Sequence, residues 1–244
     1  MTPDSNDKLY SEPKQGIDGF TFDDQVADVF SDMIARSVPG YQTTLSTIGV
    51  LAEYFAKAGS NCYDLGCSLG AVALAMRHCI GHKECKIVAI DNSAAMVARC
   101  RKAMERDHSR IPVEVIEADL RNAAIENASV VVMNFTLQFI DPDDRQLLVD
   151  RIFDGLRPGG AFILSEKLSF DDARTDRLHI DLHHAYKRSR GYTDLEIAQK
   201  RTALENVLIP ETLSRHRQRI TTAGFSSCDV WFQCLNFASL LALK

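Results

Sequence analysis

The chain has 244 residues and a formal net charge of −5; 45% of its residues are hydrophobic and 25% are charged. This composition is typical of one globular domain, or of one domain with an insertion. The acidic balance argues against a broad nucleic-acid interface. The first residues are polar, and no apolar run approaches the ~20 residues that cross a bilayer. We therefore expect a cytoplasmic protein that acts neither at a membrane nor directly on nucleic acid. Seven cysteines without a C-x-x-C pair indicate reduced thiols in a reducing compartment.

The predicted elements begin after a polar segment. We expect residues 1–22 to be flexible and residues 23–244 to form a single domain. Apolar residues recur at helical spacing over 23–37 and again over 42–55. The turn between these two helices places Tyr41 at the start of the second one.

Short apolar strands then alternate with helices. The predicted strands lie at 61–65, 86–90, 113–117, 129–133 and 161–166, and the predicted helices at 70–79, 93–106 and 143–156. This alternation predicts an α/β fold in which helices cover both faces of a parallel sheet. A turn is expected at 157–160, before the last of these strands.

Residues 168–208 interrupt the alternation, because they are highly charged and mostly helical in pattern. We interpret about 168–208 as a helical insertion that caps the carboxyl edge of the sheet. A helix at 210–224 and two strands at 228–234 and 237–243, expected to form a hairpin, complete the chain.

The turn after the first strand is the most informative motif. It reads Asp64-Leu-Gly-Cys-Ser-Leu-Gly70, and its glycines allow a ligand to approach the main chain. A strand–turn–helix unit directs backbone N–H groups and a positive helix end toward the carboxyl edge of the sheet. The G-x-x-x-G spacing, with Ser68 inside it, departs from the dinucleotide fingerprint and indicates the amino-acid end of S-adenosylmethionine. A structural turn without a ligand is the alternative. Cys67 has no evident partner base, so we interpret it as a small packing residue rather than a nucleophile.

Polar residues also follow the next three strands. Asp91 can accept hydrogen bonds from two ribose hydroxyls, or it can cap the helix that follows. Asp119 can accept from an adenine amino group beside the apolar Leu120, or it is a solvated loop acid. Asn134 lies where the sheet edge meets a substrate, or it is a turn residue. Together with Asp64, this series of strand ends predicts a nucleoside site.

These motifs resemble the class I S-adenosylmethionine-dependent methyltransferase fold over about residues 40–244, and more closely the carboxy-S-adenosyl-L-methionine synthases. The resemblance implies a Rossmann-like fold with a mostly parallel seven-stranded sheet, a terminal antiparallel hairpin and a helical insertion. The matching strings run nearly end to end: Phe-Thr-Phe-Asp (20–23), Ser-Val-Pro-Gly-Tyr (37–41), Tyr-Asp-Leu-Gly-Cys-Ser-Leu-Gly-Ala (63–71), Ala-Ile-Asp-Asn-Ser (89–93), Asn-Phe-Thr-Leu-Gln-Phe (134–139), Gln-Lys-Arg (199–201) and Trp-Phe-Gln-Cys (231–234).

The resemblance also implies a reaction. S-adenosyl-L-methionine and prephenate are converted to carboxy-S-adenosyl-L-methionine and phenylpyruvate, and the product supplies the carboxymethyl donor for modification of a tRNA wobble uridine. No metal is implied, and no side chain is assigned as a catalytic base. The residues implied to bind the cofactor or the product are Tyr41, Gly66, Cys67, Ser68, Asp91, Asn92, Asp119, Leu120, Asn134 and Arg201.

Arg201 distinguishes this reaction from methyl transfer. By position alone it is a solvated helix residue, but a guanidinium can bind a carboxylate through two charge-assisted hydrogen bonds. The family resemblance implies a homodimer in which Arg201 reaches across the interface, and it implies a downstream tRNA carboxymethyltransferase as a further partner. A conventional methyltransferase acting on a small molecule or tRNA, and a non-catalytic nucleoside-binding module, are the alternatives.

Two weaker clusters lie in the insertion and beyond it. His179, His183 and His184 have the i, i+4 spacing of metal ligands, but no third ligand is evident, so we interpret them as a helix surface. The basic residues are interpreted as solvated helix faces, with attraction of dianionic prephenate as the alternative; they are Arg174, Arg177, Lys187, Arg188, Arg190, Arg215, Arg217 and Arg219.

Overall fold

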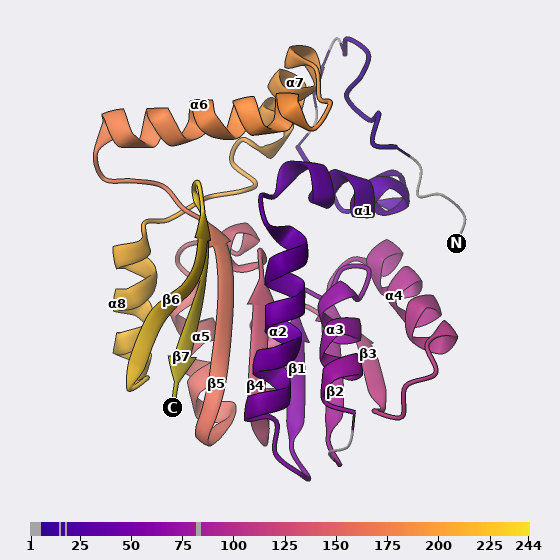
Figure 1. Ribbon diagram of the computed structural model, residues 1–244, viewed down its shortest axis with the longest axis vertical. Coiled ribbons are helices and arrows are strands. Elements are labelled where there is room, and N and C mark those ends of the chain that lie inside the picture. Colours follow the sequence, from indigo (N-terminus) through magenta and orange to yellow (C-terminus); the bar gives the residue numbers. More distant parts are fainter. Residues whose placement is uncertain (1–5, 15, 18, 82–83) are drawn as a thin grey trace.

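The computed structural model describes residues 6–14, 16–17, 19–81 and 84–244 (Figure 1). Seven strands form one sheet in the order β3-β2-β1-β4-β5-β7-β6. The strands β1 to β5 are mutually parallel, whereas β7 runs antiparallel to both β5 and β6. The predicted α/β class and the terminal hairpin are confirmed. The bounds are β1 Asn61–Leu65, β2 Lys86–Asp91, β3 Val113–Glu117, β4 Ala128–Asn134, β5 Leu156–Lys167, β6 Ser227–Cys234 and β7 Phe237–Leu243.

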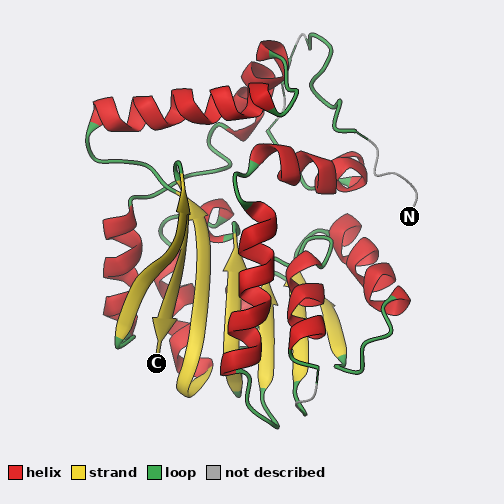
Figure 2. Cartoon of the chain, viewed as in Figure 1, coloured by secondary structure: helices red, strands yellow, loops and turns green. Residues whose placement is uncertain are grey.

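Helices cover both faces of the sheet, as Figure 2 shows. The side chains of α2 (Tyr41–Phe55), α3 (Ala71–Cys79) and α4 (Ala94–Arg106) form one buried apolar cluster with the sheet. On the other face, α5 (Arg145–Gly155) and α8 (Leu213–Ala223) contribute to a second cluster. Because both faces are covered, the central strands β1 and β4 are buried along nearly their whole length.

The strand order reverses between β1 and β4. In an open α/β sheet, ligands bind outside the carboxyl ends of the strands at such a reversal. The helices α1 (Asp24–Ser37), α6 (Ala173–Ser189) and α7 (Asp194–Leu204) lie beyond this edge (Figure 1). The helical segment expected at 168–208 is therefore present, and it lies over the edge where the sheet topology predicts a site.

The prediction of a turn at 157–160 is wrong. Residues 157–160 lie inside β5, which begins at Leu156. Leu156 pairs with Ala128 of β4, and the ladder resumes at Ala161 opposite Val130 after an irregularity. Gly159 takes a positive φ of 74° within that irregularity. The Pro-Gly-Gly sequence thus bends a strand that continues on both sides of it, because β4 supplies pairing partners on both sides.

The N-terminal segment makes polar contacts with the cap. Asp7 is 3% exposed, and its Oδ2 accepts a hydrogen bond of 2.7 Å from the Tyr192 hydroxyl. Its backbone N–H donates to Asp32 of α1, and the Lys14 N–H donates to Gln199 of α7. These contacts attach residues 6–14 to two helices. The expected flexibility of residues 1–22 concerns motion and stays a prediction, and residues 1–5, 15 and 18 lie outside the described residues.

Over the part of the chain that the structure describes, no helix has both the length and the apolar character of a membrane span.

His216 of α8 generates a prediction about pH. Its side chain is 1% exposed, and neither ring nitrogen has a hydrogen-bond partner among the described residues. Burial lowers its pKa to about 4. The histidine therefore stays neutral in the folded state at a pH where it is protonated in the unfolded state, below ~6.5. Each proton bound by the unfolded state favours unfolding. We expect this residue to lower the free energy of unfolding by about 2 kcal/mol between pH 7 and pH 5.

Urea unfolding of His216→Phe at pH 7 and pH 5 measures this contribution. The variant should lose that part of the pH dependence, whereas His108→Phe, at an exposed histidine, should keep it. An unchanged pH dependence in His216→Phe would contradict the assignment.

Candidate functional site

The turn after β1 is attached to the end of β2. The backbone N–H groups of Gly66 and Cys67 both donate to the Ile90 carbonyl, at 2.8 and 3.0 Å. Gly66 and Gly70 have positive φ values of 83° and 88°, a conformation that favours glycine. Ser68 also has a positive φ, of 48°. The turn is therefore held in one conformation by the neighbouring strand, at the carboxyl edge of the sheet.

The two glycines are also required by the protein's own packing. A Cβ at Gly66 would collide with the Thr136 side chain in the loop after β4, and a Cβ at Gly70 would lie 2.8 Å from the Cys100 sulfur. The sequence interpretation assigned the absent side chains to ligand approach. The structure adds a second reason, because Gly66 leaves room for the loop that follows Asn134.

Asp91 links this turn to the next helix. Its Oδ2 accepts from the Ser68 N–H at 2.8 Å, and its Oδ1 accepts from the Ser93 N–H at 2.9 Å. The cap of α4 is Ser93, whose side chain accepts from the Met96 N–H. Each Asp91 oxygen retains a lone pair for a ribose hydroxyl. Burial raises the pKa of Asp91 despite the hydrogen bonds it accepts. Asn92, beside it, is exposed.

Asp64 lies deeper than a strand-end ligand residue would. Its side chain is 1% exposed, and its Oδ2 accepts from the Ala73 N–H at 3.0 Å, in the first turn of α3. Burial, together with the charge of Asp91, raises the pKa of Asp64 to about 7. Burial, with the Asp64 charge, also raises the pKa of Tyr41. Tyr41 and Asp91 therefore each lie within electrostatic range of Asp64. The hydrogen bond from the Ala73 N–H makes Asp64 the residue that holds the start of α3.

Cys67 is a packed thiol. It is 3% exposed. Its hydrogen bond with Cys100, followed by burial, raises its pKa. Because a nucleophilic cysteine requires a lowered pKa, the interpretation of Cys67 as a packing residue is consistent with this environment.

Asp119 has a partner that the sequence interpretation did not consider. The Arg121 guanidinium donates to both carboxylate oxygens, with its Nη2 at 2.7 Å from Oδ2, and this ion pair lowers the pKa of Asp119. The side chain of Asp119 is 31% exposed. Leu120, next to it, is buried. An adenine amino group at Asp119 would therefore share the carboxylate with Arg121.

Asn134 ends β4 with an unsatisfied atom. Its Oδ1 is buried and has no hydrogen-bond partner among the described residues. A buried acceptor without a donor costs about 1–3 kcal/mol, so this atom fits a donor supplied by a ligand. The ring of the next residue, Phe135, lies 6.4 Å from that of Tyr41. Tyr41 itself is 8% exposed. Tyr41 therefore lies next to the residue that follows Asn134, at the carboxyl edge of the sheet.

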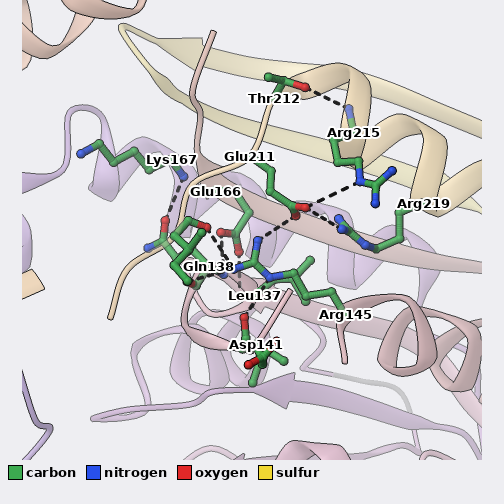
Figure 3. A network of polar contacts seen from close by, with 12 residues as sticks. Leu137, Gln138, Asp141, Arg145, Glu166, Lys167, Glu211, Thr212, Arg215 and Arg219 are labelled. Atoms are coloured by element: carbon green, nitrogen blue, oxygen red, sulfur yellow. Dashed lines mark hydrogen bonds and ion pairs between the residues drawn. The ribbon is translucent and has the colours of Figure 1, made fainter. Parts of the chain in front are cut away.

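Glu166 is a positioning residue that the sequence analysis missed. It is fully buried near the end of β5, and its carboxylate accepts from the Leu137 N–H at 2.8 Å and the Gln138 N–H at 3.0 Å (Figure 3). Burial raises its pKa to about 8. These bonds hold the loop that follows Asn134. An acidic residue shortly after the apolar run 161–164 of β5 was the signal available in the sequence.

A second buried group supports the same loop. Arg145 of α5 is fully buried and donates to the Gln138 carbonyl at 3.3 Å and the Ile140 carbonyl at 2.9 Å. It also forms an ion pair of 2.8 Å with Glu211, which is paired in turn with Arg219 (Figure 3). The interpretation of Arg219 as a solvated helix residue is wrong, since it is 4% exposed and its charge is paired.

Arg201 lies apart from the turn, on α7 in the cap. Its side chain is exposed, and it lines a cavity of about 420 Å³ together with His184 and Arg188. Within the described residues its guanidinium forms neither a hydrogen bond nor an ion pair. Within one chain, Asp91 contacts the turn and Tyr41 lies nearby. The guanidinium of Arg201, in contrast, has no hydrogen-bond or ion-pair partner among the described residues.

The interpretation of the α6 histidines and of Lys187 as a solvated helix surface is partly wrong. His183 is 5% exposed, with its Nε2 2.8 Å from the Ser37 carbonyl, so it does not belong to a helix surface. The ring of His179 stacks on Phe170 at 4.2 Å. Lys187, which was interpreted as solvated, is 8% exposed. Among the described residues, no three or more His, Cys, Asp or Glu side chains gather as a metal site requires.

The packing of Gly66 against Thr136 generates a prediction. Gly66→Ala places a Cβ into Thr136 and displaces the loop after Asn134, so we expect at least a tenfold loss of affinity for S-adenosylmethionine, measured by calorimetric titration. Gly59→Ala is the matched control, because Gly59 also has a positive φ, of 68°, but has open space where the Cβ would lie. Equal affinities in the two variants would show that the Thr136 contact does not shape the site.

Comparisons with known proteins fit this geometry. The family model of a methyltransferase domain matches residues 62–160. The chain is 58% identical to the carboxy-S-adenosyl-L-methionine synthase of Vibrio cholerae, over 98% of this chain and 97% of that protein. It is 57% identical to the synthase of Vibrio vulnificus, over 100% of both chains.

Solved structures share the fold. An O-methyltransferase family protein of Burkholderia thailandensis superposes with a TM-score of 0.64 at 18% identity, over 91% of this chain and 59% of that one. A putative S-adenosyl-L-methionine-dependent methyltransferase of Methanococcus maripaludis gives 0.60 at 18% identity, over 95% and 97%. These similarities show the Rossmann-like methyltransferase fold alone. Since the Vibrio relatives match from end to end at more than half of all positions, the chain belongs to the carboxy-S-adenosyl-L-methionine synthase family.

Proposed function

We propose that this chain converts S-adenosyl-L-methionine and prephenate to carboxy-S-adenosyl-L-methionine and phenylpyruvate. The observation that carries the proposal is the extent of the similarity to the synthases. It covers 98–100% of the chain and therefore includes the cap helices, whereas the general methyltransferase model covers residues 62–160. The cap is where the chain adds its own chemistry to a common fold.

The proposed reaction balances without an oxidant or a reductant. Prephenate aromatises to phenylpyruvate, and it loses one carboxyl group as carbon dioxide and its ring hydroxyl as hydroxide. The methyl carbon on the sulfonium gives up a proton and bonds to that carbon dioxide, while the proton and the hydroxide form water. The protein has to hold the two reactants in contact and exclude bulk water. No side chain is assigned as the base.

The residues at the sheet edge suit the adenosyl sulfonium. We assign the turn residues Gly66, Cys67 and Ser68 to the amino-acid end. Their own N–H groups are already bonded to Ile90 and Asp91, so the donors left for the ligand are the unpaired N–H groups at the start of α3. Asp91, with Asn92 beside it, retains acceptor capacity for the ribose. We assign the adenine to Asp119 and Leu120, and the unsatisfied Asn134 oxygen to a donor of the ligand.

We also propose a homodimer in which Arg201 binds the new carboxylate across the interface. Its guanidinium has no partner among the described residues of its own chain. The cap helices also expose apolar side chains, since Leu178 and Leu182 of α6 are 55% and 41% exposed and Leu195 of α7 is 39% exposed. A second copy of the chain would cover this surface. In the cell, the product would supply a cytoplasmic tRNA carboxymethyltransferase that modifies the wobble uridine.

Mass spectrometry of the nucleoside product tests the reaction. With S-adenosylmethionine and prephenate, we expect a species heavier than S-adenosylmethionine by one carbon dioxide, together with phenylpyruvate. Formation of S-adenosylhomocysteine with an acceptor, without any need for prephenate, would instead support a conventional methyltransferase.

Arg201→Ala tests the proposed contact with the new carboxylate, by comparing the affinities of the variant and the unaltered chain for the two nucleosides. We expect it to weaken binding of the carboxylated product by about 1.5–3 kcal/mol, the contribution of a charged hydrogen bond, and to change affinity for S-adenosylmethionine less. Arg188→Ala is the control, because Arg188 lines the same cavity and is already paired with Asp194. Equal losses for both nucleosides would contradict the assigned role.

A further inference from the structure

A buried lysine in the cap has no counterion. Lys187 of α6 is 8% exposed, and among the described residues its ammonium forms neither a hydrogen bond nor an ion pair. The neighbouring buried lysine differs, because Lys200 of α7 lies 3.5 Å from the Asp7 carboxylate and 5.5 Å from the centre of the Tyr192 ring. The charge of Asp7 acts on Lys187, but this carboxylate is already bound to Lys200 and Tyr192. Lys187 therefore has no anion in direct contact, and an unpaired buried charge costs several kcal/mol.

Further cations surround Lys187. The charges of Lys200 and Lys167, after burial itself, lower the pKa of Lys187 to about 7. Lys187 and Lys167, again after burial, lower the pKa of His183 to about 3, so this ring is neutral. Burial lowers the pKa of Lys167, and the charge of Arg201 lowers it further. Lys167 therefore lies within electrostatic range of both Lys187 and Arg201, and the charges of Lys187, Arg201 and Lys167 all lower the pKa of His184 after burial.

The acids nearby are few, and the structure already uses them. Asp7 binds Lys200 and the Tyr192 hydroxyl. Asp176, whose charge acts on Lys167, accepts the Phe170 N–H. The group formed by Lys167, Lys187 and Arg201, which we call the cap cation cluster, therefore has an excess of positive charge. Its two lysines are poorly solvated, whereas Arg201 is exposed.

The cap cation cluster lies next to the site at the sheet edge. Lys167 is the last residue of β5 and pairs in register with Phe237 of β7. Figure 3 shows the Lys167 side chain directed away from Gln138 and the buried arginine network. The Phe237 ring packs against His183 at 4.9 Å and against Phe135 at 5.9 Å. Since Phe135 follows Asn134, an aromatic wall joins the cluster to the loop of the nucleoside site.

We propose that Lys167 and Lys187 bind a carboxylate of the anionic co-substrate, beside the aromatic wall of Phe135 and Phe237. The chemistry that fits this place is a cyclic acid with two carboxylates, since the cations neutralise its charge and the aromatic side chains cover its ring. The assignment rests on the proposed function, in which prephenate is that acid. It gives the lysines a role in holding the donor of carbon dioxide, distinct from the role of Arg201 toward the product.

Binding of prephenate to Lys187→Met and to Lys167→Met tests the site. Calorimetric titration of the full chain, saturated with S-adenosylhomocysteine, measures binding without turnover, because this nucleoside lacks the reacting methyl group. We expect the dissociation constant for prephenate to rise about 10- to 100-fold in each variant, as for the loss of one charged hydrogen bond. The dissociation constant for S-adenosylhomocysteine should stay within about twofold of the unaltered chain.

Arg177→Met is the matched control, since it removes a charge from an exposed residue of the same helix. It should leave prephenate binding unchanged. The thermal midpoint of Lys187→Met should not fall, because the substitution removes an unpaired buried charge. Unchanged prephenate affinity in both lysine variants, or an equal loss in Arg177→Met, would overturn the assignment while carboxylation by the unaltered chain persists. Absence of any carboxylated product from the unaltered chain would instead overturn the proposed function.

Discussion

The carboxylate of Asp91 is the contact on which the geometry of the nucleoside edge depends. It accepts one N–H group from the turn after β1 and another from the start of α4, so it fixes two strand ends and one helix relative to one another. The same turn also donates two N–H groups to the carbonyl of Ile90, the residue before Asp91. Removing this carboxylate would leave two backbone N–H groups without an acceptor, and it would also remove the proposed acceptor for the ribose hydroxyls. The structural role and the binding role of Asp91 are therefore inseparable.

The same device recurs at two other strand ends. Asp64 holds the first turn of α3 through the Ala73 N–H, and Glu166 holds the loop after β4 through two N–H groups. In each case a side chain at or near a strand end accepts N–H groups that loops and helix starts leave unpaired. Burial raises the pKa values of Asp64, Asp91 and Glu166. The site is thus built on carboxylates that the protein itself uses, and among the proposed ligand residues Asn134 retains a buried unsatisfied atom.

The cap differs in character from this edge. At the sheet edge, charges and polar groups are mostly satisfied within the chain, whereas Lys187 and Arg201 of the cap have no partners among the described residues. An edge whose polar groups are mostly satisfied suits a nucleoside that many enzymes of this fold share. A cap with unpaired cations suits anionic groups specific to one reaction. The unpaired cations therefore favour the cap as the place where the proposed reaction gains its specificity.

The strands, the helices and the turn at 64–70 could be predicted because their signals are local: apolar periodicity, glycine spacing and a polar residue at each strand end. The sequence by itself also placed Asp91 and Asn134 at one edge, since parallel strands end on the same side. Only the tertiary structure decided that Ser93 caps α4, that Gly66 leaves room for Thr136 and that β5 continues through the expected turn. It also decided that His183 and Lys187 are buried, although their helix is as charged as a solvated one. The physical reason is that burial depends on what packs over a helix face, and the residues that do so, such as Phe237 and Ser37, are distant in the chain.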